Sequence, residues 1–289
     1  MFGFRKKENK PNLAPMLDAL KRNEISIEAT KPNGSPYASR IGGSPSVPRD
    51  FVWPRYEAEN YDGETANRPL SFLCQINLDE VGAFDREKML PEKGMLLFFY
   101  EMESMCWGYD PADDGCTRVY YFEDIGTLET MACPDDLAEE YRIKEYGLSF
   151  GARDSYPDFE ELDLHADTDC DWDEYDEALE SQGCEIDCER HKLLGYADLI
   201  QGEILSECER TERGLYCGDA KSYQETPDDI KADIARAATD WQLLFQMASI
   251  QDDDFELMFG DLGNLYFYIL KHDLEKCRFD RVRFALQCG

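Results

Sequence analysis

Basic residues and histidines are scarce in this 289-residue sequence, and that scarcity limits the partners it can have. It contains 3 histidines and 30 lysines and arginines, against 62 aspartates and glutamates, for a formal net charge of −32. So much negative charge repels phosphate backbones and anionic lipid head groups. We therefore expect no nucleic-acid partner and no membrane partner. The charge either serves solubility alone or favours a positively charged partner such as a basic protein.

The cysteines lack the spacing of a metal or redox site. Their number, 11, is odd, and the nearest pair is Cys184 and Cys188, which leaves no C-x-x-C motif for a zinc ribbon or a thioredoxin-type site. The first eleven residues are basic but lack the apolar stretch of a signal peptide, and no window approaches the roughly 18 apolar residues of a membrane span. We expect a cytoplasmic protein with reduced thiols and without a metal.

Motifs for nucleotide binding and nucleophilic catalysis are also missing. No glycine-rich loop with phosphate-binding spacing and no nucleophile elbow occurs. Gly42 and Gly43 favour a tight turn with positive φ over a phosphate loop, since a proline follows closely. Carboxylate pairs are too common in so acidic a chain to indicate acid–base catalysis. We expect no catalytic residue and no cofactor, although an enzymatic role stays open.

Apolar runs and turn signals predict an α+β fold of mainly antiparallel sheets with flanking helices. Strands are expected at residues 25–27, 70–76, 94–100, 118–122, 241–247, 262–270 and 278–286. Helices are expected at residues 13–20 and 228–240, the second with Thr226 as its N-cap and Pro227 in its first turn.

Residues 154–189 are exceptionally acidic, with 16 aspartates and glutamates and no lysine or arginine. This charge density predicts a solvated insert with a short helix at 174–182. Calcium is the functional alternative, but the position that needs glycine in a calcium loop is Glu174. We therefore favour contact with a basic partner over metal binding. The residues proposed for that contact are Asp167, Asp169, Asp171, Asp173 and Glu174.

Three short motifs occur twice in the same order, which suggests a duplication. Residues 72–76 match 243–247, with Gln75 on Gln246, and residues 94–100 match 263–269. Upstream, residues 39–43 match 191–195. The predicted organisation is one unit over 1–289, with half-repeats at 25–150 and 190–289 around an acidic insert at 151–189. Each glutamine must be bonded if buried, either by tying down a neighbouring loop or by facing a cleft between the repeats.

The same motifs resemble the YwqG-like family of bacterial proteins. The matching segments are 40–45, 53–54, 69–78, 90–100, 191–202, 260–267 and 278–288. Phe259 and Ala197 depart from the family pattern, in which tryptophan and proline are usual. The resemblance implies an α+β fold, no established activity, and an association with toxin–immunity neighbourhoods.

Two functions are carried forward from the sequence. The first is a protein-binding module of the immunity type that neutralises a basic toxin through acidic surface residues. The second is a small-ligand-binding protein or enzyme that uses a cleft between the half-repeats. The residues proposed to line that cleft are Arg40, Trp53, Gln75, Trp107, His191, Gln201, Gln246 and Asp261.

Overall fold

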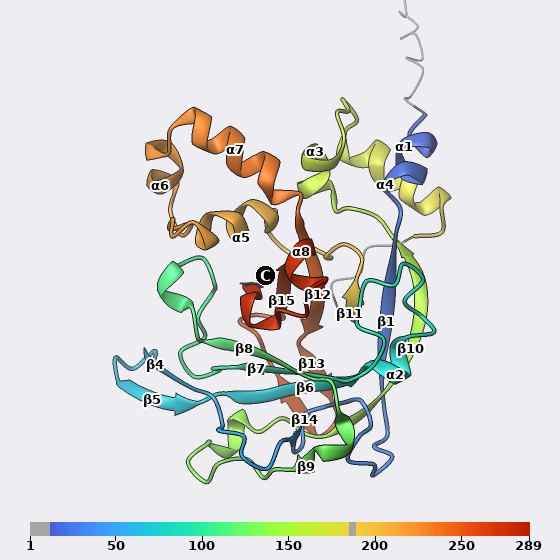
Figure 1. The fold of residues 1–289 in the computed structure, drawn as a ribbon. Coiled ribbons are helices and arrows are strands. Elements are labelled where there is room, and N and C mark those ends of the chain that lie inside the picture. Colours follow the sequence, from blue (N-terminus) through green and yellow to red (C-terminus); the bar gives the residue numbers. More distant parts are fainter. Residues whose placement is uncertain (1–11, 185–188) are drawn as a thin grey trace, which may run out of the picture.

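A ten-stranded sheet forms the centre of the structure, a computed structural model that describes residues 12–184 and 189–289 (Figure 1). Every neighbouring pair of its strands is antiparallel, which confirms the α+β class with mostly antiparallel sheets. Across the sheet, the strands are β16 (Arg283–Gln287), β15 (Asn264–Leu270), β12 (Trp241–Ala248), β11 (His191–Leu194), β1 (Arg22–Thr30), β10 (Tyr146–Ser155), β2 (Arg40–Ile41), β6 (Ser71–Asn77), β7 (Met95–Tyr100) and β8 (Thr117–Phe122).

The strand order is the same on both sides of the central pair formed by β1 and β10. Outward from β10 come β2, β6, β7 and β8, and outward from β1 come β11, β12, β15 and β16. The second strand of each group carries a register shift, between Phe72 and Cys74 in β6 and between Leu243 and Phe245 in β12. We call these groups the first and second four-strand blocks.

The sheet bends so that its two blocks face each other across one apolar core. Phe98 of β7 contacts Phe245 of β12 and Phe267 of β15, with ring centroids 4.6 and 5.2 Å apart. All six residues of β7 are buried, as expected for a strand too apolar to face solvent. Figure 1 shows the bend: β6 and β7 run horizontally in this view, whereas β12 and β15 run vertically. Burial on both faces explains the continuous apolar runs in the sequence.

Helices form two groups above the sheet in Figure 1. On the right, α1 (Ala14–Leu20), α3 (Leu162–His165), α4 (Trp172–Ser181) and the 3-10 turn η4 (Phe159–Glu161) share a small core. On the left, α5 (Leu205–Glu212) and α7 (Asp228–Ala238) pack in one core with β12 and β15, α6 (Ala220–Glu225) lies farther out, and α8 (Lys271–Leu274) follows β15. Within the described ranges, no helix has the length and apolar character needed to cross a bilayer.

Three two-stranded sheets and several short helical elements complete the fold in the described residues. Two of these small sheets are hairpins, β4 (Arg55–Glu59) with β5 (Thr65–Pro69) and β13 (Ile250–Asp252) with β14 (Phe255–Leu257), and the third pairs the distant strands β3 (Ser46–Val47) and β9 (Glu129–Thr130). The short helical elements are α2 (Leu78–Val81), η1 (Pro111–Asp113), η2 (Ile125–Thr127), η3 (Glu139–Tyr141) and η5 (Phe279–Arg281).

Four local expectations need correction. Thr226 does not cap α7: its hydroxyl donates to the carbonyl of Ser222, so the side chain serves the end of α6 instead. The last strand begins at Arg283, because η5 occupies residues 279–281. The boundary predicted between residues 150 and 151 falls inside β10, which continues to Ser155. The acidic segment holds more helix than expected, with η4 and α3 before α4, whose apolar face is buried.

Gly42 and Gly43 form the predicted turn after β2. Both have positive φ, 62° and 71°, and a Cβ on Gly42 would lie 2.3 Å from the carbonyl oxygen of Lys144. Gly63 has a similar φ of 79°, but a Cβ added to it would have no other atom within 4 Å. Gly42 is therefore required for close backbone packing as well as for its φ angle.

We expect Gly42→Ala to lower the free energy of unfolding by about 2 kcal/mol more than Gly63→Ala, since both lose a favourable φ but only the first creates a clash. Urea denaturation of both variants measures the difference. Equal losses would show that the turn relaxes without cost.

Candidate functional site

Residues 195–204 connect β11 to α5, and Gln246 of β12 fixes the position of this β11–α5 loop. The Gln246 amide oxygen accepts the backbone N–H of Asp198 at 2.9 Å. Its amide nitrogen donates to the carbonyl of Arg190 and to the Asp198 carboxylate, both at 3.1 Å. A buried amide left unbonded costs about 1–3 kcal/mol, so this full set of bonds stabilises the loop.

Gln75 of β6 anchors the loop before β2 and the turn after it in the same way. Its amide oxygen accepts the Ser46 N–H at 2.9 Å and the Arg40 guanidinium at 3.3 Å. Its nitrogen donates to the carbonyls of Pro36 and Ala38, at 3.0 and 2.8 Å. The side-chain amides of both glutamines are thus hydrogen-bonded to neighbouring loops. Both side chains are buried, and neither faces a cleft.

A buried ion cluster joins the β11–α5 loop to the middle of the sheet. Lys192, 1% exposed, places its Nζ 3.1 Å from Oε2 of Glu24 and 2.8 Å from Oδ2 of Asp198. Arg190 approaches the other Asp198 oxygen at 2.8 Å. Burial alone would raise the pKa of Asp198, but Lys192 and Arg190 outweigh it and lower that pKa. Asp198 is therefore ionised and holds the loop to the strands beneath it.

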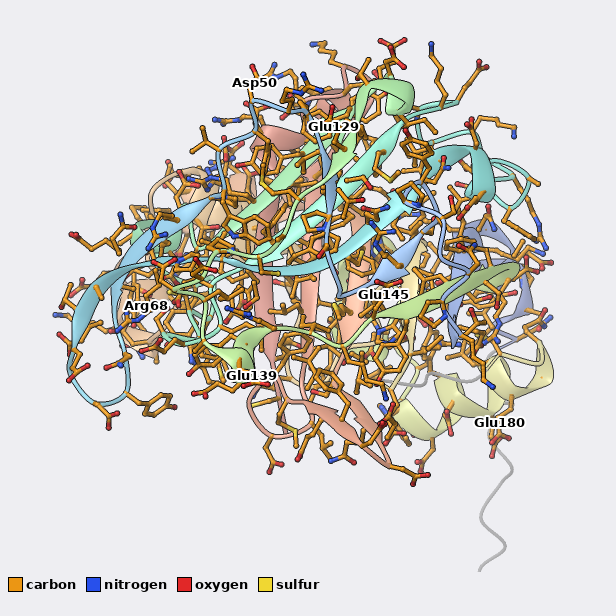
Figure 2. All side chains as sticks on the ribbon, turned by 90° about the horizontal axis from the view of Figure 1, so that it is seen from below. Asp50, Arg68, Glu129, Glu139, Glu145 and Glu180 are labelled. Carbon is orange, nitrogen blue, oxygen red and sulfur yellow. The ribbon has the colours of Figure 1, made fainter. Side chains whose placement is uncertain are left out.

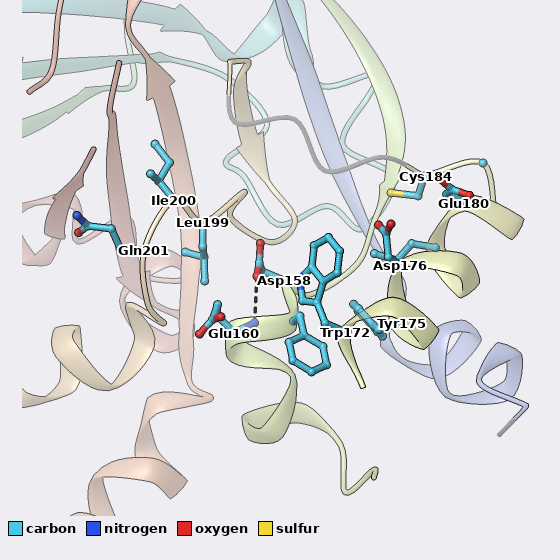
Figure 3. Close-up of a pocket in the computed structure, with 13 residues that line it drawn as sticks. Asp158, Glu160, Trp172, Tyr175, Asp176, Glu180, Cys184, Leu199, Ile200 and Gln201 are labelled. Carbon is cyan, nitrogen blue, oxygen red and sulfur yellow. Dashed lines mark hydrogen bonds between the residues drawn. The ribbon is translucent and has the colours of Figure 1, made fainter. Parts of the chain in front are cut away.

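A cavity of about 730 Å³ lies between the β11–α5 loop and α4 (Figure 3). Its apolar and aromatic lining consists of Phe159, Trp172, Tyr175, Leu179, Leu199 and Ile200. Its charged lining consists of Asp158, Glu160, Asp176 and Glu180, and no lysine or arginine lines it among the described residues. We call it the acidic cavity.

Local sequence explains how α4 forms one wall of the acidic cavity. Asp171 caps the helix and pairs with Glu174 in a capping box, which satisfies the first free backbone N–H groups. Tyr175 and Leu179 point inward, and the Tyr175 hydroxyl donates to the Pro157 carbonyl at 2.7 Å. Trp172, in the first turn, is 58% exposed at the cavity. The helix backbone therefore holds the Trp172 indole and the carboxylates of Asp176 and Glu180 in defined positions at the cavity.

Carboxylates dominate the electrostatics of the acidic cavity. Asp158 lies between the loop and α4 in Figure 3, and burial raises its pKa to about 6 despite the hydrogen bond from the Glu160 N–H. The carboxylates of Asp176 and Glu180 are exposed and make no ion pair within the described chain. Some surface acids lie elsewhere: Figure 2 shows Glu129 and Glu139 away from Glu180, which lines the cavity. Negative charge is therefore spread over the molecule, and at this cavity it borders an aromatic hollow of about 730 Å³.

A second cavity, of about 250 Å³, lies on the other side of the β11–α5 loop. Its lining is Trp107, Tyr109, Gln201, Gly202, Glu207, Leu286 and Gln287. Gln287 fixes the loop here: it accepts the N–H groups of Ile200 and Gln201, both at 3.1 Å, and donates to the Gly202 carbonyl at 2.7 Å. We call it the aromatic cavity.

The loop after β7 supplies the aromatic wall of this second cavity. The Trp107 carbonyl accepts the Leu286 N–H and the Tyr109 carbonyl accepts the Cys217 N–H, both at 2.9 Å. The Trp107 and Tyr109 rings stack with centroids 6.3 Å apart. Elements far apart in the sequence therefore line this cavity together: the loop after β7 in the first block, the last strand of the second block, and α5.

A family model described as a domain of unknown function (DUF1963) matches residues 39–288. The chain belongs to this family. A comparison with curated proteins found no match. The DUF1963 match contains both cavities and every strand of the central sheet except β1. The family carries no assigned function, so the chemistry of the chain's own residues must supply one.

Two of the eight residues predicted to share a cleft do so in this DUF1963 chain. Trp107 and Gln201 both line the aromatic cavity. The side-chain amide nitrogen of Gln201 also donates a hydrogen bond to the Cys288 carbonyl at 2.9 Å. Arg40 contacts Gln75 but lies in the buried turn described above. Gln246 is buried beneath the β11–α5 loop.

The remaining three of those residues lie elsewhere. Trp53 donates its indole N–H to the Leu70 carbonyl at 2.8 Å in a separate core. His191 accepts the Ala248 N–H at 3.1 Å, and burial lowers its pKa to about 4, so it is a neutral, structural histidine. Asp261 is exposed and contributes its backbone carbonyl to the N–H of Gly289.

The acidic residues predicted to contact a partner lie next to the acidic cavity without lining it. Asp167, Asp169 and Asp173 are exposed, whereas Asp171 and Glu174 form the capping box of α4. Across residues 12–184 and 189–289, no group of three or more histidines, cysteines or acids is placed to hold a metal ion.

Sequence reasoning missed most of the residues that line the two cavities. For the acidic cavity a signal existed: Trp172, Tyr175 and Leu179 follow the i, i+3, i+7 spacing of one helix face. For the aromatic cavity, Glu207 and Gln287 come from distant elements and share no local pattern. Their proximity depends on the bend of the sheet.

Proposed function

We propose that this protein is a non-enzymatic module that binds a basic segment of a partner protein in the acidic cavity. One observation carries the proposal: every charged residue described in the lining is a carboxylate, and these carboxylates surround an apolar floor with the exposed indole of Trp172 at its edge. Lysine and arginine side chains combine a cationic head with an apolar stem, so they match both parts of such a lining.

The charge of the whole molecule supports this assignment. A net charge of −32 attracts a basic partner over a distance of about one Debye length and accelerates the encounter. The net charge attracts any basic partner, whereas the shape and lining of the acidic cavity select a particular basic segment. An immunity-type role, in which the partner is a basic toxin, is the biological form of this function that we propose.

The proposed setting is the bacterial cytoplasm, in a protein of the YwqG-like type. The motifs around Arg40, Trp53 and His191 support the YwqG-like assignment, and the DUF1963 match is consistent with it. The ten cysteines in the described part of the chain are all free, which supports a reducing compartment.

The two four-strand blocks are proposed to be half-repeats of one duplicated unit. In register, Gln75 lies opposite Arg40 in the first block and Gln246 lies opposite Lys192 in the second. The N–H groups bonded to the two amide oxygens, of Ser46 and Asp198, follow those cations by the same number of residues. Repeated bonding at repeated positions supports a common origin.

Binding of a small ligand is a second candidate function. The observation that favours it is the meeting of Trp107 and Gln201 at the aromatic cavity, between elements of the two blocks.

Binding of a basic peptide tests the main proposal. We expect a peptide of about ten residues that alternates lysine and leucine to bind one-to-one, and to bind about tenfold more weakly at 300 mM than at 50 mM NaCl. Isothermal titration calorimetry measures both affinities. A glutamate–leucine peptide of equal length is the control and should not bind. Equal affinity for both peptides, or no dependence on salt, would contradict the proposal.

A further inference from the structure

The aromatic cavity has a chemistry of its own that the acidic cavity does not explain. Trp107 and Tyr109 stack on one side, and the Tyr216 ring packs edge-on against Tyr109 at 5.8 Å. Trp107 and Tyr109 are half-buried in the cavity lining, and Tyr216 is exposed beside it. Electron-rich ring faces at the edge of a hollow attract cations, with a strength that grows as water is excluded.

Glu207 places a carboxyl group in the same cavity without a counter-ion. No hydrogen bond or ion pair within the described chain reaches its carboxylate. The nearest cation, Arg210, is engaged elsewhere: it donates to Thr226 and to the Tyr216 carbonyl, and its guanidinium lies 4.0 Å above the Tyr223 ring. A carboxylate this close to aromatic rings and lacking a partner is suited to receive one from outside.

We propose that the aromatic cavity is a binding site for an organic ammonium group, held against Trp107 and Tyr109 with Glu207 as its counter-ion. Leu286 gives the cavity an apolar contact for the methyl or methylene groups of such a ligand. The ammonium group could belong to a free amine or to a modified lysine of a protein. This inference is independent of the basic partner proposed for the acidic cavity, because the two cavities lie on opposite sides of the β11–α5 loop and share only Gln201.

Binding at this site should depend on pH. Burial and the neighbouring Glu203 raise the pKa of Glu207 to about 7, and Arg210 opposes them only in part. A cation needs the ionised carboxylate, so affinity should rise as pH increases from about 6 to about 8. The other titratable groups near Glu207 are Cys208, Cys217 and Tyr223, whose pKa values burial raises, so all three stay neutral over this range.

Choline and its neutral isostere 3,3-dimethylbutan-1-ol test the inference directly, because they share shape and differ in charge. With the tryptophans labelled with nitrogen-15, the indole signal of Trp107 should shift with choline at a dissociation constant of about 1–10 mM. The isostere should bind at least about tenfold more weakly. Nα-acetyl-trimethyllysine amide and choline, compared at equal concentration, distinguish a modified lysine from a free amine as the better ligand.

Two variants and one control complete the experiment. Glu207→Gln, followed by the Trp107 signal, and Trp107→Leu, followed by the line width of the choline methyl signal, should each weaken choline binding by about tenfold or more, and Glu207→Gln should also remove the pH dependence. Trp172→Leu, in the acidic cavity, should leave choline binding unchanged. Thermal unfolding checks that each variant is folded, and Tyr109→Leu replaces any that is not. Absence of saturable choline binding, or equal binding of choline and the isostere, would overturn the inference and leave the acidic-cavity proposal intact.

Discussion

Lys192→Met should lower the free energy of unfolding by about 3–5 kcal/mol at neutral pH, the largest effect of any single substitution considered for this protein. Lys192 is the cation between Glu24 and Asp198, and it is 1% exposed. Its removal leaves two buried carboxylates with Arg190 as the remaining cation paired with both in the described part of the chain. Methionine fills the space of the lysine stem. The loss in free energy of unfolding therefore measures the effect of removing the charge and not that of creating a cavity.

The loss should shrink at low pH. The pKa of Asp198 is lowered in the native protein, so its stabilising contribution is present above the ordinary aspartate pKa and disappears as pH falls through the lowered one. Urea denaturation at about pH 7 and about pH 3, below the ordinary aspartate pKa of about 3.9, measures both values. Lys231→Met, which removes an exposed lysine paired with Asp228 on α7, is the control and should change stability by less than about 0.5 kcal/mol.

A triple variant separates charge from packing. Adding Glu24→Gln and Asp198→Asn to Lys192→Met also removes the two buried negative charges, with Arg190 as the charged residue kept, so we expect the triple variant to regain part of the lost stability. If the triple variant is less stable than Lys192→Met alone, the hydrogen bonds of the cluster matter more than its unpaired charges.

Asp176→Asn with Glu180→Gln should weaken binding of the lysine–leucine peptide by about 10–100-fold, the largest expected effect on function. Both carboxylates are exposed on α4, line the acidic cavity and make no ion pair in the described chain. Neither caps the helix, so the exchange to amides leaves the fold in place. The dependence of affinity on salt should fall in parallel, because fewer charges take part.

The matched control removes the same charge from another part of the surface. Glu139→Gln with Glu140→Gln alters two exposed acids of η3. If the acidic cavity is the binding site, this control should change affinity by less than about twofold. Equal losses in the two double variants would mean that the peptide responds only to net charge, which would contradict the proposed site.

Much of the fold was readable from the sequence, for a clear physical reason. Strands buried on both faces are apolar, throughout in β7 and in β12 apart from the hydrogen-bonded Gln242 and Gln246, and short links between strands require antiparallel pairing. The helix at α1 was also predicted correctly from its apolar face. Where prediction failed, the cause was local: the Thr226 hydroxyl serves α6, and η5 precedes the last strand.

The two cavities were much harder to predict than the strands. In the acidic segment, charge density concealed the amphipathic pattern of α4, so Trp172 was not recognised as a contact residue. At the aromatic cavity, Trp107 and Gln201 were predicted to share a cleft, but Glu207 was not. Its role depends on burial and on the engagement of Arg210 elsewhere, which only the three-dimensional arrangement reveals.

The most direct test of the proposed function is the response of the four tryptophan indole signals to the lysine–leucine peptide. The indole N–H groups of Trp53 and Trp241 are buried and bonded to Leu70 and Glu209, so they serve as internal references. We predict a saturable shift of the Trp172 signal, at peptide concentrations that match the calorimetric affinity, with the two references unmoved. A peptide that binds while the Trp172 signal stays fixed would place the basic partner elsewhere and contradict the account.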